Sequence, residues 1–180
     1  MEDTFEPSVT FKIICMGAGG VGKTSLCQRF DKGIFSADYR LTIGTGFFIK
    51  DIILENGVKV KIQVWDLGGQ QRFMPLHGPY VMGAHGALLV FSITSQDSLQ
   101  ALIEWYNLFK THSDRNAQMC LVSTKHDLHK KDWQVSNEQI KNFMEKHQIF
   151  AYANTSAKED WNVSTPFQKI AELLARVYQI

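Results

Sequence analysis

The sequence contains no hydrophobic run that approaches the 20 or so apolar residues needed to cross a bilayer. Its N-terminus, MEDTFEPSVT, is acidic and has no apolar stretch of signal-peptide length. No linker rich in proline, glycine and serine, no internal repeat and no low-complexity tract divides its 180 residues. These absences predict a soluble, intracellular protein, and the hydrophobic content of 44% is sufficient for one domain with one core.

An excess of charge of one sign is also absent. The 19 Lys and Arg residues nearly balance the 18 Asp and Glu residues, and the net charge is +1. The basic residues are scattered, and their longest cluster, residues 129–131, is typical of an exposed turn. Nucleic acid is therefore not an expected partner, and charge alone would not attract the chain to a membrane.

Cysteine is scarce and follows no metal-binding spacing. Cys15, Cys27 and Cys120 lie within apolar patterns, which predicts small core residues in a reducing compartment. The final residues, RVYQI, offer no cysteine for prenylation, and Glu2 stands where N-myristoylation requires glycine. We expect that the chain is not lipidated or that it has lost a lipid-bearing tail.

Apolar patterns of two kinds alternate along the chain. Strands are predicted at residues 11–16, 46–54, 58–65, 86–93, 119–123 and 149–153, and helices at residues 25–30, 96–110, 137–147 and 166–178. Asn56-Gly57 between two apolar runs predicts a hairpin. The alternation indicates an α/β fold: one three-layer domain with a six-stranded, mostly parallel sheet, one antiparallel edge strand, and helices on both faces. The four tryptophans are expected mostly in the core, with no role assigned.

Residues 17–24, GAGGVGKT, match a phosphate loop between a strand and a helix. Its glycines allow backbone N–H groups to surround a polyphosphate at the positive end of the helix. Lys23 would reach the outer phosphates, and Thr24 would offer its hydroxyl to Mg²⁺. The alternative is a glycine-rich turn without a ligand. The expected phosphate-binding residues are Gly19, Gly20, Val21, Gly22, Lys23, Thr24, Ser25 and, farther along the chain, Gly69.

A second motif, Asp66-Leu67-Gly68-Gly69, follows the strand expected at residues 58–65. An aspartate at the end of a strand in a phosphate-loop protein is expected near the magnesium ion. Gln70 directly after it could orient water for in-line attack on the terminal phosphate. The alternative is a turn-forming aspartate with two glycines.

Thr124-Lys125-His126-Asp127 follows another expected strand and is the candidate for reading a base. The carboxylate of Asp127 can accept both N1–H and N2–H of guanine, whereas adenine offers no such pair of donors. The aliphatic stem of Lys125 can lie against the ring. Lys-x-Asp alone is too short to be specific, but the motif at residues 155–158, Thr-Ser-Ala-Lys, follows the last strand and strengthens it.

With these motifs in order, the chain resembles a small GTPase of the Ras superfamily, most similar to the Rab family. Residues 39–44 match the first switch, and residues 65–73 match the second. The resemblance implies a G domain at residues 11–180 after an N-terminal extension at residues 1–10. It also implies that Thr42 is a second magnesium ligand beside Thr24 and Asp66. The implied guanine-binding residues are Phe35, Thr124, Lys125, Asp127, Ser156, Ala157 and Lys158.

Two departures from the Rab pattern are visible. Leu67-Gly68 replaces the usual Thr-Ala, so that residues 68–70 resemble the Arf family, and Thr124 replaces the usual asparagine, as in Rho proteins. Loss of that amide is expected to weaken the ties to guanine N7 and to the phosphate loop. An Arf-like or Rho-like switch is therefore an alternative within the superfamily.

The resemblance implies a GTP-binding switch with slow intrinsic hydrolysis that regulates membrane trafficking through effectors. The expected catalytic groups are Gln70, which positions water, and Lys23, which stabilises developing charge. Mg²⁺ and GTP or GDP are the expected ligands, and effectors, an exchange factor and an activating protein are the expected partners of a monomer. The expected location is the cytoplasm, peripheral to membranes if a tail is missing. Alternatives are a scaffold with little turnover and a small-molecule kinase.

Overall fold

The computed structural model describes residues 9–37 and 42–180. Residues 39–41 of the expected first switch therefore lie outside the described residues, as does most of the expected N-terminal extension. The strand expected at residue 11 begins at Val9. The division of the chain at residue 10 stays a prediction.

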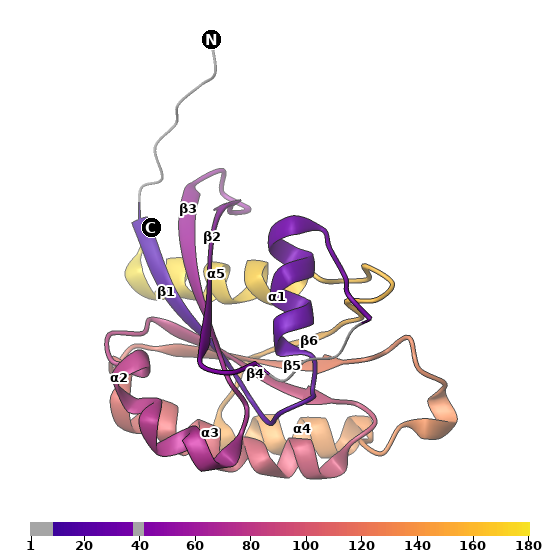
Figure 1. Ribbon diagram of the computed structural model, residues 1–180. Helices are drawn as coiled ribbons and strands as arrows, with labels where there is room; N and C mark the ends of the chain where they lie inside the picture. Colours follow the sequence, from indigo (N-terminus) through magenta and orange to yellow (C-terminus); the bar gives the residue numbers. More distant parts are fainter. Residues whose placement is uncertain (1–8, 38–41) are drawn as a thin grey trace.

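The described chain forms one sheet of six strands in the order β2-β3-β1-β4-β5-β6 (Figure 1). All neighbours run parallel except β2 and β3, so the edge strand β2 is the antiparallel one. This confirms the predicted fold class. The strands are β1 Val9–Met16, β2 Thr45–Ile53, β3 Lys59–Leu67, β4 Gly86–Ser92, β5 Gln118–Thr124 and β6 Ala151–Asn154.

The strand patterns follow from what covers them. Every residue of β4 is buried, since helices cover both faces of this central strand. β3 alternates between buried and half-buried residues. The hairpin between β2 and β3 turns at Gly57, whose φ of 85° lies in the left-handed region that glycine adopts easily. The predicted Asn-Gly hairpin is confirmed.

Helices cover both faces of the sheet. In Figure 1, α2, α3 and α4 lie together on one side of the sheet, and α1 and α5 lie on the other. The short elements η1 and α2 were not predicted, because four to six residues interrupted by glycine and proline show no helical periodicity. The helices are α1 Lys23–Lys32, η1 Gln71–Leu76, α2 Gly78–Val81, α3 Gln96–His112, η2 Lys130–Asp132, α4 Asn137–His147 and α5 Thr165–Tyr178.

Each face of the sheet has its own hydrophobic core. All three cysteines are buried and free, as expected. Trp105 is buried and Trp65 and Trp133 are half-buried against the α3 side, whereas Trp161 is 48% exposed. No helix among the described residues is both long enough and apolar enough to span a membrane.

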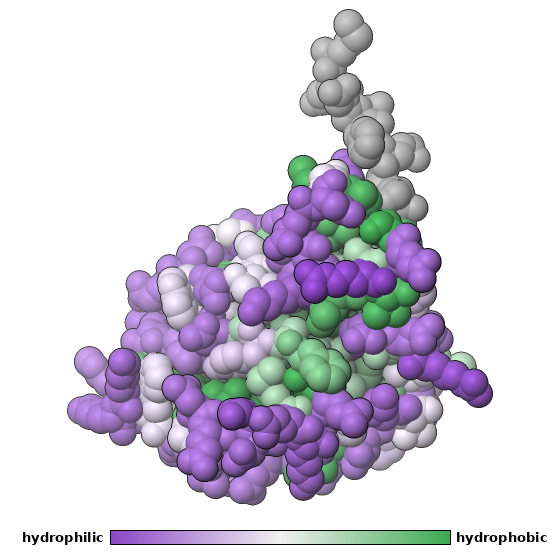
Figure 2. All heavy atoms as spheres, turned by 180° about the vertical axis from the view of Figure 1, so that it is seen from behind, coloured by the Kyte–Doolittle hydropathy of each residue, from purple (hydrophilic) through white to green (hydrophobic). Residues whose placement is uncertain are grey.

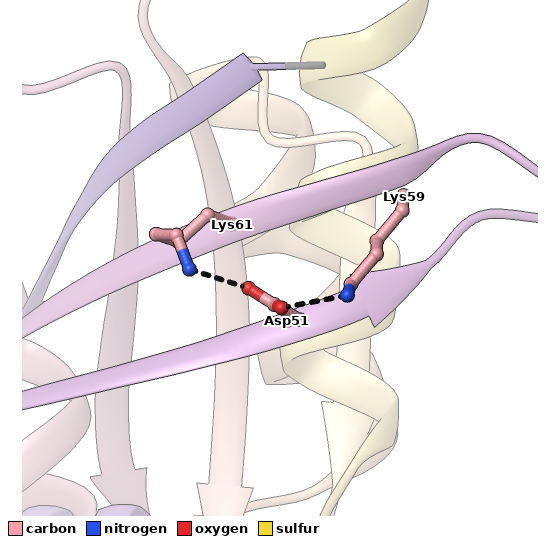
Figure 3. Close-up of polar contacts among 3 residues, drawn as sticks. All are labelled: Asp51, Lys59 and Lys61. Carbon is pink, nitrogen blue, oxygen red and sulfur yellow. Dashed lines mark hydrogen bonds and ion pairs between the residues drawn. The ribbon is translucent and has the colours of Figure 1, made fainter. Parts of the chain in front are cut away.

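The surface carries both hydrophilic and hydrophobic side chains. On the face in Figure 2, hydrophilic residues dominate the rim, and hydrophobic residues gather near the centre and toward the upper right. The outer side of the β2–β3 hairpin carries a charged cluster (Figure 3). There, Asp51 accepts from Lys61 Nζ at 2.8 Å and pairs with Lys59 Nζ at 3.0 Å. These hydrogen bonds, with that from Lys61 the strongest, lower the pKa of Asp51.

Candidate functional site

A cavity of about 590 Å³ opens where the parallel strands β1, β3, β5 and β6 end. This is the edge of an α/β sheet at which ligands bind, and the volume suits a small organic molecule. The residues that line it are Gly19, Gly20, Gly22, Lys23, Thr24, Ser25, Gln28, Phe35, Ser36, Ala37, Thr42, Gly69, Thr124, Lys125, Asp127, Leu128, Ala157 and Lys158.

Most predicted site residues thus come together. The predicted residues that do not line the cavity are Val21, Asp66, Gln70 and Ser156. Sequence reasoning missed Gln28, Ser36, Ala37 and Leu128. Gln28 lies one helical turn after Thr24, and Leu128 directly follows Asp127, so helical spacing and adjacency were the available signals.

The phosphate loop depends on two glycine conformations. A side chain at Gly17 would come within 2.1 Å of the Val90 carbonyl oxygen, so the loop can pass β4 only without one. Gly22 has a φ of 102° and precedes the first turn of α1, where no side chain caps the helix and no acidic residue is present. The free N–H groups and positive end of α1 therefore face the cavity, which suits an anion.

Lys23 is only 5% exposed, although it lines the cavity. Its ammonium donates to the carbonyl oxygens of Gly17 at 2.8 Å and Ala18 at 2.9 Å. Burial lowers the pKa of Lys23, and the nearby Asp66 carboxylate counteracts that shift. The side chain therefore holds the loop closed around itself, with one N–H left for a ligand oxygen.

Three predicted metal ligands are in direct contact. Thr24 Oγ1 donates to Asp66 Oδ2 at 2.5 Å, and Thr42 Oγ1 lies 2.5 Å from Thr24 Oγ1. Asp66 Oδ1 is buried and has no hydrogen-bond partner among the described residues. Burial raises the pKa of Asp66, against the effects of Thr24 and Lys23. A set of oxygen ligands with one unsatisfied carboxylate oxygen fits Mg²⁺, which prefers hard oxygen donors.

The second switch packs directly on the phosphate loop. A side chain at Gly69 would lie 2.4 to 2.5 Å from backbone atoms of Gly17, Ala18 and Gly19. Gly68 N–H donates to Gly44 O at 2.9 Å, which joins the two switch segments. Gln70 is half-buried and does not line the cavity, and its Oε1 accepts from Arg72 Nε at 3.0 Å.

Thr124 connects the motif at residues 124–127, the candidate for reading a base, to the phosphate loop at residues 17–24. Its hydroxyl lies 2.5 Å from Val21 O and 3.1 Å from Phe91 O. Loss of the asparagine amide was expected to weaken the contact between this motif and the phosphate loop. The threonine hydroxyl makes that contact instead, through its hydrogen bond to Val21 O. Lys125 adopts a φ of 64°, a left-handed conformation that is rare outside glycine and is often found at functional sites.

Asp127 is oriented by a residue from the last motif. Ser156 Oγ donates to Asp127 Oδ1 at 2.7 Å, which leaves the other carboxylate oxygen for a ligand. Arg29 of α1 secures the same loop, since its Nε donates to Ala157 O at 2.8 Å. The Arg29 guanidinium also lies 5.9 Å from the Phe35 ring. Sequence reasoning missed this arginine because its partner is 128 positions away.

Comparison with known proteins agrees with this site. The model of the Ras family matches residues 12–176. The Ras-related protein Rab-19 of Xenopus laevis is 39% identical over 167 residues, 92% of this chain and 78% of the relative. Rab-11A of Dictyostelium discoideum is 38% identical, covering 94% and 77% of the two chains. Human Rab-30 is 37% identical, covering 89% and 78%.

The family match spans every motif that contributes to the cavity. Proteins of this family bind GTP and GDP and hydrolyse GTP, which agrees with a cavity lined both by the phosphate loop and by Asp127. The chain therefore belongs to the Ras family and is a Rab-like small GTPase.

Proposed function

We propose that this GTPase is a Mg²⁺-dependent switch whose two switch segments meet at the terminal phosphate of GTP. One observation carries the proposal: Thr24, Thr42 and Asp66 are joined by 2.5 Å contacts although they come from three separate segments. Thr24 and Asp66 are anchored in regular elements, whereas Thr42 precedes β2 in an irregular stretch. Loss of the terminal phosphate would release Thr42 first.

Thr24, Thr42 and the Asp66 carboxylate would hold Mg²⁺. When bound, the ion would neutralise charge on the β- and γ-phosphate oxygens. The hydrogen bonds among the three side chains would then be exchanged for bonds to the ion or its water. The unsatisfied Asp66 Oδ1 supports this role, because a buried carboxylate oxygen without a partner is costly.

The hydrolytic residues act on phosphate and water. Lys23 and the loop N–H groups from Gly19 to Ser25 would stabilise charge that develops on the phosphates, and Gly69 N–H would bond the γ-phosphate. Gln70 would position water, but only after it exchanges its contact with Arg72 for one with the cavity. That requirement supports slow intrinsic turnover. An activating protein that supplies an arginine would add about 10³- to 10⁵-fold.

Guanine would be read by Asp127, which Ser156 orients. The Lys125 stem and Phe35 would lie against the ring, Ala157 N–H would meet O6, and Lys158 would close the loop behind it. Thr124 would keep this loop in register with the phosphate loop.

Effectors and regulators would bind where the switches adjoin three aromatic rings. Phe47 and Tyr80 are 47% and 38% exposed, and Trp65 lies between them with ring centroids 4.8 and 6.1 Å away. An exposed aromatic cluster of this kind is typical of a protein interface. We propose that a cytoplasmic monomer regulates membrane trafficking through this surface, held at a membrane if its native chain carries a lipidated tail.

The test has two parts. Freshly purified protein is denatured and the released nucleotide identified by chromatography, and single-turnover hydrolysis of loaded GTP is then followed with and without Mg²⁺. We expect guanine nucleotide and slow, Mg²⁺-dependent turnover that Gln70→Leu abolishes. Gln71→Leu is the matched control, since that side chain contacts Glu104 instead. Bound GTP that is never hydrolysed would favour the scaffold, and absence of guanine nucleotide would contradict the proposal.

A further inference from the structure

His77 lies behind the second switch, outside the nucleotide cavity and outside every motif described above. It occupies the position between η1 and α2 and is 4% exposed. Its Nε2 lies 3.0 Å from the carbonyl oxygen of Gly68. A carbonyl only accepts hydrogen bonds, so Nε2 carries the proton and donates.

The ring is fixed by its surroundings. It stacks on Trp105 of α3 with ring centroids 5.5 Å apart and planes 29° apart, and Tyr80 approaches it at 6.4 Å. Nδ1 is buried without a hydrogen-bond partner among the described residues. This burial lowers the pKa of His77, which favours the neutral ring. A buried neutral ring that stacks on Trp105 and donates through Nε2 is held in this orientation by both contacts.

The bonded carbonyl belongs to the peptide group that contains Gly69 N–H. A peptide group is planar and trans, so its C=O and N–H point in opposite directions. Fixing the Gly68 oxygen toward His77 therefore aims Gly69 N–H away from His77. Gly69 lines the nucleotide cavity, whereas His77 does not. The two residues that flank this peptide are both glycine, so side chains offer no resistance to its rotation.

We propose that His77 is a positioning residue that holds the Gly68–Gly69 peptide with its N–H aimed at the γ-phosphate. The inference rests on the proposed function, in which Gly69 N–H bonds that phosphate. GDP has no γ-phosphate, so His77 affects GTP binding and hydrolysis and leaves GDP binding unchanged. Its contacts with Trp105 and Tyr80 also connect the peptide to the aromatic surface that partners would use.

The test uses two variants, one of which keeps the ring and the other the hydrogen-bond donor. His77→Phe keeps the ring on Trp105 but removes the donor, and His77→Gln keeps an amide N–H the same number of bonds from the backbone. We expect His77→Phe to weaken affinity for a non-hydrolysable GTP analogue about tenfold, the lower end of what a hydrogen bond to a charged group contributes. Single-turnover hydrolysis should slow as well, while GDP affinity stays within about twofold. His77→Gln should restore most of the loss.

The outcomes separate this inference from the proposed function. A wild-type protein that binds no guanine nucleotide would contradict the proposed function itself. A wild-type protein that hydrolyses GTP, with a His77→Phe variant that discriminates GTP from GDP equally well, would overturn only the role of His77. Equal weakening of GDP and GTP binding would also overturn it, because that pattern indicates general loss of structure.

A second measurement requires no variant. Nitrogen-15 NMR of the wild-type histidines at pH 7 should show the His77 ring neutral and protonated at Nε2, as is also expected of His85, whose Nδ1 accepts from Lys12 N–H. A ring protonated at Nδ1, or a charged ring, would overturn the proposal, since the carbonyl of Gly68 would then lack the donor that the geometry requires.

Discussion

The two sides of the nucleotide cavity are built differently. The fixed side contains four buried residues that lie in or next to regular elements: Lys23, Asp66, Thr124 and Ser156. Each side chain is hydrogen-bonded to the phosphate loop, to the first turn of α1 or to Asp127. On the switch side, Ile43 is 85% exposed, and the Gln70 side chain accepts a hydrogen bond from Arg72, two residues away. The proposed function assigns affinity and base selection to the fixed side and the response to the γ-phosphate to the switch side.

The largest effect is expected on the fixed side, from Lys23→Met. The substitution keeps an unbranched side chain of similar length but leaves the carbonyl groups of Gly17 and Ala18 without their donor and removes a charge from the phosphates. Since each charge-assisted hydrogen bond contributes about 1.5 to 3 kcal/mol, affinity for GDP and GTP should fall by about 100-fold or more. Equilibrium titration with a fluorescent nucleotide measures this change.

Lys32→Met is the control for that prediction. Lys32 is exposed in the last turn of the same helix, and its replacement should leave both affinities unchanged. Equal affinities for Lys23→Met and Lys32→Met would remove the basis for calling this side of the cavity the source of affinity.

Asp127→Asn should have the next largest effect and should alter selection rather than phosphate binding. Guanine affinity should fall by about 10- to 150-fold, the range for loss of a charge-assisted hydrogen bond. The affinity for xanthine nucleotides should rise, because the asparagine amide offers a donor where the carboxylate offered an acceptor. Competition between the two nucleotides is the measurement, with the exposed Asp132→Asn as control. Retained preference for guanine would contradict the assignment of Asp127 as the residue that reads the base.

Much of the fixed side was predictable from the sequence, and the reason is local. Glycine spacing, strand ends and adjacent motifs place Lys23, Thr24, Asp66 and Asp127 at one edge of the sheet. These signals are short segments whose conformation depends on their own residues. The hairpin at Asn56-Gly57 was predictable for the same cause.

Side-chain contacts between distant segments were not predictable. Arg29 contacts Ala157 and His77 contacts Gly68 only because the tertiary fold brings them together. No periodic pattern in the sequence indicates either contact. The Gln70–Arg72 bond is local, but its rotamers depend on what surrounds η1. The elements η1 and α2 escaped prediction because each is too short for a helical pattern to emerge.

A smaller effect on the switch side is expected from Arg72→Met. It removes the donor that holds the Gln70 side chain and should raise the fraction of molecules in which Gln70 reaches the cavity. An exposed hydrogen bond contributes about 0.5 to 1.5 kcal/mol, so intrinsic single-turnover hydrolysis should rise by about 2- to 10-fold. In a Gln70→Leu background, Arg72→Met should leave the rate of intrinsic hydrolysis unchanged. An effect of equal size in both backgrounds would show that Arg72 acts elsewhere.

The smallest effect is expected from Asp51→Asn, which belongs to neither side of the cavity. Its ion pairs with Lys59 and Lys61 are partly exposed and should contribute about 0.2 to 1 kcal/mol to stability. The pKa of Asp51 is lowered in the folded protein. The contribution is therefore present above pH 3.8 and lost as the pH falls through the folded pKa. Urea unfolding at pH 7 measures it, and a change in nucleotide affinity would contradict this separation.

The most direct test of the difference between the two sides is amide hydrogen exchange with GDP and with a non-hydrolysable GTP analogue. The account predicts that the analogue slows exchange at residues 42–46 and 68–77 and leaves residues 17–24 and 124–127 as they are with GDP. Equal changes at residues 124–127, or no change at residues 68–77, would contradict the division into a fixed side and a switch side.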